Sequence, residues 1–378
     1  MKVGIIGASG FIGLRAVEFL EERMDAHIIP IVRSYASLAV LARVRRPWRV
    51  CDLLDTRSLV GALEGCDVVV HVALGDSRQI VAMARVAYKA CAAAHVKRLV
   101  WMSSASVHGQ SPVSGTKESS PLHVKHPFPY NNAKVLAERE LRTLSRTGSV
   151  EIVLLRPSIV YGPRSRWITE PAEALRQSRA GWVDGGRGMC NCIYVDNLCE
   201  AIRLACIASA AAGETFLVND AETVTWKTFL LAIAAHLGYG LDDFEEVAPI
   251  VPTHESSNLV GTLASSSLYG LFGSLIPWNV KRGIKAIGKA YKGIAPGDNP
   301  WAMVGRPGPR MTEEMNLLQQ CEWKLPNAHI ETSIGYRPVV SFEEGMKRSL
   351  EWFDFIDLGR IRVPSESNPC QRRSYGTS

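Results

Sequence analysis

The first part of the chain, up to about Pro157, alternates short apolar runs with segments of helical periodicity. Short runs rich in Val and Ile predict buried strands, and apolar residues at i, i+3 and i+4 predict helices. The predicted strands are Lys2–Ile6, His27–Val32, Trp48–Cys51, Asp67–Val72, Arg98–Met102 and Glu151–Leu155. The predicted helices are Leu14–Arg23, Ile80–Ala94 and Tyr130–Leu144. This alternation favours an α/β fold built on a doubly wound parallel sheet.

The length of 378 residues exceeds what one compact core usually spans, so we expect two lobes. Residues 1–161 are predicted to form the sheet domain, with residues 193–219 returning to it. Residues 162–192 and 220–356 are predicted to form a smaller, mostly helical C-terminal lobe that binds the substrate. Residues 357–378 lack apolar periodicity and are expected to form a disordered tail.

One stretch of the second lobe has an unusual charge pattern. No residue between Glu255 and Lys281 is charged, and a basic amphipathic pattern follows. This combination is compatible with peripheral contact of residues 259–292 with an anionic membrane surface. Packing of the segment within the second lobe is the alternative. The apolar stretch is rich in Gly and Ser and ends at Pro277, so it makes a poor membrane-spanning helix.

Composition excludes several classes of partner. The formal net charge of +6 is mild, and no basic stripe with interleaved aromatic residues is present. We therefore expect no nucleic-acid partner, whereas an acidic small molecule suits the charge. The nine cysteines are scattered and predict neither a disulfide framework nor a metal site. With no signal peptide expected, the protein is predicted to be cytoplasmic, with membrane association as the alternative.

The segment GASGFIG, at Gly7–Gly13, separates the first predicted strand from the first predicted helix. Gly7 permits a tight turn, Gly10 lets the backbone approach a pyrophosphate, and Gly13 lets helix and strand pack closely. The free amides at the helix N-terminus then face the phosphates. The strand–turn–helix context is the one this motif requires, so we predict a Rossmann-type NAD(P) site.

The ends of the second and third strands bear on the choice of cofactor. An NAD site usually has a carboxylate after the second strand, where this chain has Arg33. Because a guanidinium would pair with a 2′-phosphate, Arg33 favours NADP over NAD. Asp52 follows the third strand and is placed to contact the adenine amino group. A helix cap for the following segment is the alternative for Asp52.

Tyr130 and Lys134 lie four residues apart, after Pro129, at a predicted helix start. At this spacing both side chains lie on one helix face and can share a ligand. An ammonium and a nicotinamide ring nearby would favour the phenolate, so Tyr130 could exchange a proton with a substrate hydroxyl. Ser104, at the end of the fifth strand, could hydrogen-bond the same substrate oxygen.

The chain resembles the extended short-chain dehydrogenase/reductase family, the class of nucleotide-sugar epimerases and dehydratases. The resemblance covers most of Met1–Asn219 and resumes near Ile334–Phe353. The matching segments are GASGFIG (Gly7–Gly13), VVVHVA (Val68–Ala73), SSASVHG (Ser103–Gly109), YNNAK (Tyr130–Lys134), RPSIVYGP (Arg156–Pro163), YVDNL (Tyr194–Leu198) and GYRPVVSFEEGMKRSLEWF (Gly335–Phe353).

The resemblance implies that Ser104, Tyr130 and Lys134 are the catalytic residues and that Ser106 contacts the substrate. It places Ala73, Pro157, Ser158 and Val160 at the nicotinamide end. The full set of expected cofactor contacts is Gly7, Ser9, Gly10, Phe11, Ile12, Gly13, Arg33, Asp52, Leu53, Ala73, Lys134, Pro157, Ser158 and Val160. The resemblance also suggests a homodimer formed through the helices that include Tyr130.

Two departures from the family pattern narrow the reaction. His108 stands where a tyrosine is usual, and Ala105 follows Ser104 where dehydratases carry an acidic residue, which disfavours dehydration. The leading expectation is an NAD(P)-dependent oxidoreductase or epimerase acting at a carbinol of a nucleotide-linked sugar. One alternative resembles 3β-hydroxysteroid dehydrogenases and acts on a lipid-like alcohol. Another is a non-catalytic NAD(P) sensor. Residues from about 241 to 320 match nothing in the family and leave the substrate open.

Overall fold

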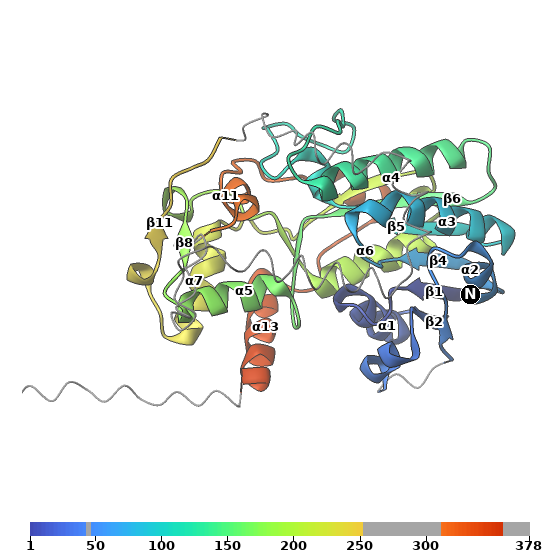
Figure 1. The fold of residues 1–378 in the computed structure, drawn as a ribbon, viewed down its shortest axis with the longest axis horizontal. Coiled ribbons are helices and arrows are strands. Elements are labelled where there is room, and N and C mark those ends of the chain that lie inside the picture. Colours follow the sequence, from blue (N-terminus) through green and yellow to red (C-terminus); the bar gives the residue numbers. More distant parts are fainter. Residues whose placement is uncertain (43–46, 252–310, 358–378) are drawn as a thin grey trace, which may run out of the picture.

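The computed structural model describes residues 1–42, 47–251 and 311–357. The predicted membrane-contact segment, 259–292, and the predicted tail beyond residue 357 lie outside these ranges. A larger lobe holds the central sheet, and a smaller, mostly helical lobe lies beside it (Figure 1). The α/β fold with a doubly wound parallel sheet is therefore confirmed.

The central sheet has seven strands in the order β10-β6-β5-β4-β1-β2-β3, and every neighbouring pair is parallel. The strands are β1 (Lys2–Ile6), β2 (His27–Val32), β3 (Arg49–Val50), β4 (Val68–His71), β5 (Arg98–Met102), β6 (Glu151–Pro157) and β10 (Thr215–Val218). Most of these bounds lie within a residue or two of the predicted ones. β10 supplies the edge strand beside β6, far along the chain from its neighbours.

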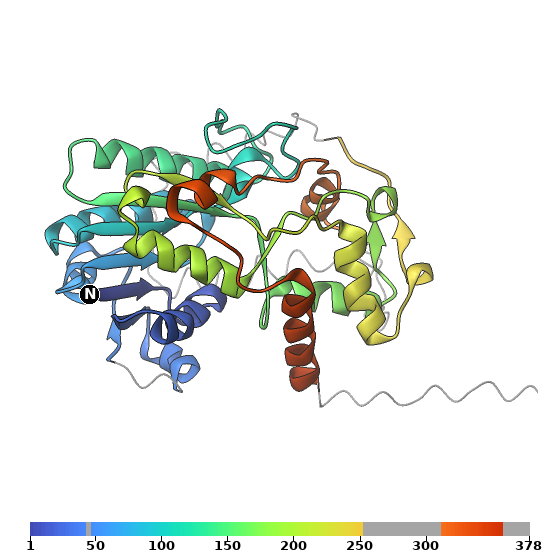
Figure 2. The same cartoon turned by 180° about the vertical axis from the view of Figure 1, so that it is seen from behind.

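Two hydrophobic cores flank the sheet, which explains why its strands are almost continuously apolar. Alternate strand residues point to opposite faces, so Val68 and Val70 enter one core whereas Val69 enters the other. Helices on the second face are α2 (Thr56–Leu63), α3 (Ile80–Ala93) and α4 (Pro129–Ser145). The first face carries α1 (Phe11–Arg23) and α6 (Val195–Ile207), which lie side by side (Figure 2).

The smaller lobe is built from short elements around one helical cluster. Its helices are α5 (Arg166–Arg176), α7 (Trp226–Leu237), α11 (Glu313–Gln319) and α13 (Phe342–Asp357). A two-stranded ribbon pairs β8 (Gly181–Trp182) with β11 (Glu245–Glu246). Burial of Trp226, Phe229 and Ile233 on α7 fixes this helix in the core that the lobe shares with the sheet.

Two segments lie elsewhere than the sequence suggested. Strand β9 (Cys192–Tyr194), at the start of the segment 193–219 predicted to return to the sheet domain, pairs with β7 (Ile159–Tyr161) in a separate ribbon rather than with the central sheet. Helix α12 (Ala328–Ile334), from the range expected for the second lobe, packs against edge strand β10. Both segments are short, so their apolar residues carry too little periodicity to show what they pack against.

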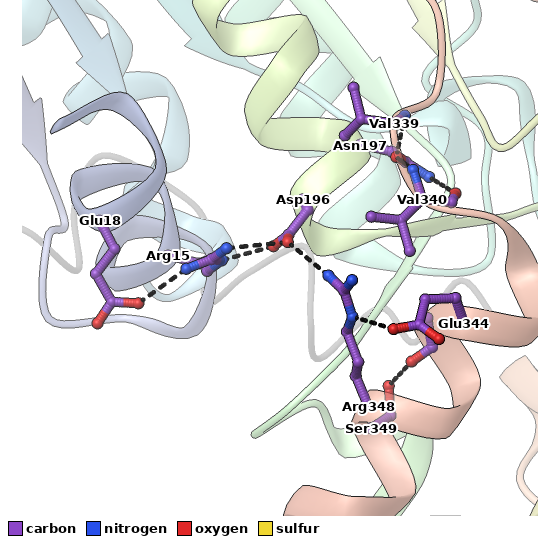
Figure 3. A network of polar contacts seen from close by, with 10 residues as sticks. Arg15, Glu18, Asp196, Asn197, Val339, Val340, Glu344, Arg348 and Ser349 are labelled. Atoms are coloured by element: carbon purple, nitrogen blue, oxygen red, sulfur yellow. Dashed lines mark hydrogen bonds and ion pairs between the residues drawn. The ribbon is translucent and has the colours of Figure 1, made fainter. Parts of the chain in front are cut away.

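A polar network ties the two lobes together around the start of α6 (Figure 3). The buried carboxylate of Asp196 accepts hydrogen bonds from Arg15 Nε and Nη2 of α1, at 2.6 and 2.9 Å. Arg348 of α13 lies 3.6 Å from the same carboxylate. The neighbouring Asn197 accepts the backbone N–H groups of Val339 and Val340. The first helix of the sheet domain and the C-terminal helix thus share one anchoring point.

Two glycines of the loop occupy positions that a residue with a side chain would not fit. Gly7 has φ +89°, a conformation that favours glycine. A Cβ atom at Gly13 would lie 2.1 Å from the carbonyl oxygen of Gly7. Helix α1 and the end of β1 therefore approach as closely as the sequence motif predicts for a pyrophosphate-binding turn.

We expect Gly13→Ala to destabilise the protein by about 1–3 kcal/mol, because the new methyl group overpacks the α1–β1 contact. The control is Gly61→Ala on α2, where a Cβ atom meets nothing within 4 Å. Alanine at that helical position is expected to be neutral or stabilising. Urea unfolding of both variants measures the effect, and equal free energies of unfolding would contradict the assigned contact.

Candidate active site

A cavity of about 840 Å³ lies where the carboxyl ends of β4, β5 and β6 face the smaller lobe. Its sheet-side wall comes from residues that follow these strands and from the first turn of α1. Its other wall comes from α5, α7 and α11. Ligands of doubly wound sheets bind at this edge, so the cavity is the candidate active site.

The structure brings together the expected catalytic residues and most of the residues expected at the nicotinamide end. The predicted residues that line the cavity are Phe11, Ile12, Ala73, Ser104, Ser106, Tyr130, Lys134, Pro157, Ser158 and Val160. The other expected cofactor contacts lie at the glycine loop and at the ends of β2 and β3. They are Gly7, Ser9, Gly10, Gly13, Arg33, Asp52 and Leu53.

Tyr130 lies in the first turn of α4, directly after Pro129, and its ring lines the cavity. Burial raises the pKa of its phenol to about 12, and a hydrogen bond with Ser104 opposes this shift. Desolvation of the phenolate outweighs the contacts that stabilise it. The phenol therefore carries its proton at neutral pH.

Lys134 lies one turn further along α4 and is buried. Its Nζ donates a 2.7 Å hydrogen bond to the carbonyl of Met102 and lies 5.6 Å from the ring centroids of both Trp101 and Tyr130. Burial lowers the pKa of the ammonium to about 8, and the charge of Glu138 opposes this. The ammonium is thus held against the phenol ring at the end of β5.

Ser104 lies two residues after β5 and caps the short 3₁₀ helix Ala105–His108. Its Oγ accepts the backbone N–H of Ser106 and lies 2.9 Å from the Ser106 hydroxyl oxygen. Ser104, Ser106 and Tyr130 all line the cavity, and Ser104 also hydrogen-bonds the Tyr130 phenol. The two serines and the phenol form a cluster that can hydrogen-bond one oxygen atom of a ligand.

A buried ion pair joins the elements that carry this cluster. Glu138, on α4, accepts Arg156 Nε and Nη2 at 2.9 and 2.6 Å, and both side chains are almost fully buried. The same carboxylate accepts the hydroxyl of Ser103, the neighbour of Ser104. Arg156 also lies 3.1 Å from Nε2 of His108, which is a packed histidine rather than a cavity residue. The network locks α4 to the ends of β5 and β6.

Arg33 and Asp52 lie near the end of the sheet expected to receive the adenosine. Arg33 is exposed directly after β2. The Asp52 carboxylate accepts the backbone N–H of Leu54, and the cap of α2 is Asp55, so the helix-cap alternative for Asp52 is wrong. An exposed carboxylate in a local turn stays accessible to an adenine amino group.

Several cavity residues were not anticipated from the sequence. An apolar wall comes from Phe128, Trp167, Met189, Trp226, Leu318 and Leu325. Arg164, Arg166 and Glu314 provide charge beside it. These residues come from segments far apart in the chain, so only the fold brings them together. Glu138, which is buried outside the cavity, was also not anticipated, although it lies one turn beyond Lys134 on the same helix face.

Across 1–42, 47–251 and 311–357, no cluster of three or more His, Cys, Asp or Glu side chains is arranged to hold a metal ion. The eight cysteines in these ranges are buried and free. Over the same residues, no helix combines the length and apolar character that crossing a membrane requires.

The sheet order, the glycine loop and the Ser104–Tyr130–Lys134 cluster define the class of extended short-chain dehydrogenases/reductases. Residues 4–247 match the profile of the 3-beta hydroxysteroid dehydrogenase/isomerase family, and the chain belongs to that family. The family assignment rests on this match over most of the chain and does not depend on any single relative.

Two curated relatives illustrate the family's range. The chain is 24% identical over 329 residues to "3beta-hydroxysteroid-dehydrogenase/decarboxylase isoform 2" of Arabidopsis thaliana, with 82% of this chain and 52% of the relative covered. It therefore spans about half the length of that relative. It is 29% identical to a "4-hydroxy-2-methyl-3-oxo-4-farnesyl-3,4-dihydroquinoline-1-oxide ketoreductase" of Stigmatella aurantiaca, with 61% and 71% covered.

Among solved structures, the fold is similar to the dTDP-glucose 4,6-dehydratase DesIV from Streptomyces venezuelae, which was crystallised with NAD and TYD. The TM-score is 0.67 at 20% identity, with 95% of this chain and 98% of the other covered. A likeness at this level of identity shows a shared fold.

Proposed function

We propose that this protein is an NAD(P)-dependent oxidoreductase that interconverts a secondary alcohol and a ketone on a lipid-like substrate. The observation that carries the proposal is one cavity with Ser104, Tyr130 and Lys134 on the sheet side and an apolar wall opposite them. Apolar walls recognise apolar ligands, and a few polar groups fix the reacting oxygen. The names of the Arabidopsis and Stigmatella relatives, a hydroxysteroid dehydrogenase and a farnesyl-compound ketoreductase, support this substrate class.

The residues at the sheet edge fit a dinucleotide. The turn at Gly7 leaves no room for a side chain, because a Cβ atom there would lie 2.7 Å from the backbone of Ala73. The first turn of α1, which follows Gly10, presents backbone N–H groups for phosphates, and Lys134 can hold ribose hydroxyls. A bound nicotinamide supplies or accepts the hydride in this chemistry.

Tyr130 is the proposed general acid and base. Its neutral phenol can donate a proton to a ketone oxygen as that oxygen becomes an alkoxide. Ser104 hydrogen-bonds the same oxygen, and Lys134 stabilises the phenolate that remains. In the oxidative direction the phenolate would take the proton from the alcohol. The buried Glu138–Arg156 pair holds α4 in place against the sheet in both directions of the reaction.

A nucleotide-linked sugar is the second candidate substrate, and two arginines favour it. Arg164 and Arg166 line the cavity, and guanidinium groups bind diphosphates well. The experiment measures NAD(P)H formation with pregnenolone and 3-hydroxydodecanoate, and epimerisation of UDP-glucose. We expect oxidation of a lipid alcohol and no reaction of the sugar nucleotide. Turnover of UDP-glucose without turnover of either lipid would show that the second candidate is correct.

Arg33 is proposed to select NADP. We expect Arg33→Asp to weaken NADP binding about tenfold or more, because a charge-assisted contact with the 2′-phosphate is replaced by repulsion. Binding of NAD, which lacks this phosphate, is expected to hold or improve. Arg57→Asp on α2, also exposed, controls for the change in net charge. Dissociation constants for both cofactors decide the matter, and equal losses for NADP and NAD would exclude the assignment.

Membrane contact through residues 259–292, a homodimer through α4 and a cytoplasmic location remain proposals that rest on the sequence. The basic amphipathic pattern supports the first, and family resemblance supports the second. Co-sedimentation with anionic vesicles and analytical ultracentrifugation test them. Absence of vesicle binding at low salt, or a monomer at micromolar concentration, would exclude the respective proposal.

A further inference from the structure

The imidazole of His126 lies between the two elements that carry the candidate catalytic hydroxyl groups. One is the turn Ser104–Gly109 (the serine turn), with the hydroxyls of Ser104 and Ser106, and the other is the first turn of α4, with Tyr130. His126 is 8% exposed and does not line the cavity. Any effect of this ring on a bound substrate must therefore pass through these two elements.

The ring of His126 holds the serine turn directly. Its Nε2 lies 3.1 Å from the carbonyl oxygen of Val107, in the middle of that turn. Because a carbonyl oxygen only accepts, Nε2 carries the hydrogen and Nδ1 stays unprotonated in the neutral ring. The same ring lies beside Gly109, where a Cβ atom would be 3.9 Å from Nδ1. The imidazole thus contacts the serine turn at its centre and at its end.

The backbone of His126 is fixed to α4. Its N–H donates to Oδ1 of Asn132 at 2.9 Å, and its carbonyl accepts Nδ2 of the same residue at 2.8 Å. Asn132 lies in the first turn of α4, two residues after Tyr130. A side chain that both accepts from and donates to one backbone residue fixes its distance and its direction. His126 therefore links the serine turn to the helix turn that carries Tyr130.

The groups that face the His126 ring are basic. His123, which is exposed, stacks on it with 4.2 Å between ring centroids. His108, in the serine turn, acts on the ring across the turn and is itself bound by Arg156, which pairs with Glu138. Burial lowers the pKa of His126 below its usual 6.5, and His123 adds to this shift, whereas the bond to the serine turn opposes it. A positive charge on this ring is therefore disfavoured.

We propose that His126 is a positioning residue that sets the Tyr130 phenol against the hydroxyls of Ser104 and Ser106, and that this link loosens in acid. The inference rests on the proposed function, since it concerns the geometry of the same three hydroxyl groups. The neutral ring fits its buried place, whereas the protonated ring brings an uncompensated charge there. Because the pKa of the folded ring is lowered, the link is complete above pH 6.5 and is lost as the pH falls below it.

The first experiment measures kcat and KM for reduction of methyl 3-oxododecanoate by NADPH. We expect His126→Ala to lower kcat about tenfold to a hundredfold and to leave KM nearly unchanged, because displacement of a catalytic group by about 1 Å has an effect of this size. His126→Gln should restore most of kcat at neutral pH, since its amide can donate to Val107 in place of Nε2. His27→Gln is the control, because His27 is exposed at the amino end of β2, and it should keep full activity.

The pH profile of the same reaction separates positioning from support of the fold. In reduction the neutral phenol is the proton donor, so acid does not by itself disable Tyr130. We expect kcat of the wild-type protein to fall below pH 6.5 and kcat of His126→Gln to stay level there. His123→Phe keeps a stacked ring but removes a basic neighbour, so its loss of kcat should begin at a higher pH. Equal acid losses in the wild type and His126→Gln would overturn the inference.

Hydrogen exchange, followed by mass spectrometry on the cofactor-free protein at neutral pH, tests the link apart from turnover. We expect His126→Ala to speed exchange in both the serine turn and the first turn of α4, and His126→Gln and His27→Gln to leave both unchanged. The inference is wrong if exchange in His126→Ala equals that of the wild type, or if His126→Gln loses as much kcat as His126→Ala. Faster exchange of both turns in His126→Ala, in a protein that reduces no ketone, would support the link and contradict only the proposed function.

Discussion

Tyr130→Phe is expected to lower the turnover of a lipid alcohol by about a hundredfold to ten-thousandfold, the usual contribution of a general acid or base. The change removes only the hydroxyl group that exchanges a proton with the substrate oxygen. The ring stays beside the Lys134 ammonium, so cofactor binding and folding are expected to hold. Steady-state assays of NAD(P)H formation, with the cofactor dissociation constant measured in parallel, test this result.

The control is Tyr88→Phe on α3. Tyr88 is a buried tyrosine whose hydroxyl has no hydrogen-bond partner among the residues that the structure describes, and it lies in a core cluster and does not line the cavity. We expect full activity from this variant. Retained hydride transfer in Tyr130→Phe, with cofactor still bound, would contradict the catalytic assignment. Absence of turnover in the wild-type protein, with tight cofactor binding, would favour the non-catalytic sensor.

Glu138→Gln is expected to destabilise the protein by about 3–5 kcal/mol, because it leaves the charge of Arg156 buried without its counter-ion. Arg156 is 1% exposed, so water cannot replace the lost carboxylate. The hydroxyl of Ser103 also loses a charged acceptor. Urea or thermal unfolding measures the change, with circular dichroism as a check that the fold persists.

Glu140→Gln provides a matched control on the same helix. Glu140 pairs with Arg85 at 2.6 Å, a distance equal to that of the buried pair, but both side chains reach solvent. Solvent screening makes such pairs weak, so we expect a change several times smaller than for Glu138→Gln. Equal losses in the two variants would show that burial does not govern the strength of the Glu138–Arg156 pair.

The sheet domain could be predicted because its signals are local. Each strand is a short apolar run, and the glycine loop and the Tyr130–Lys134 spacing are complete within one strand–helix unit. The smaller lobe gave no such signal. Its ribbon strands have two residues each, which cannot show alternation, and α5 contains Pro171. Arg166 and Glu314 meet across the cavity only because α5 and α11 pack around it.

The direction of the Tyr130 pKa shift could not be predicted from the sequence either. Spacing shows that an ammonium lies near the phenol, and that favours the phenolate. The exclusion of water from the phenol depends on the second lobe, and the position of that lobe could not be predicted from the sequence. Desolvation is the largest influence on this phenol, so the missing information decided the sign.

The position of β10 has a consequence for any attempt to divide the protein. This strand returns from the smaller lobe to cover β6, and α6 returns with it. A fragment ending near residue 161 would leave the apolar β6 as an open edge and would leave α1 without α6 on the first face of the sheet. Unprotected edges of this kind recruit strands from other chains. A fragment of this length is therefore expected to precipitate when expressed alone, and a working fragment would have to extend past residue 218.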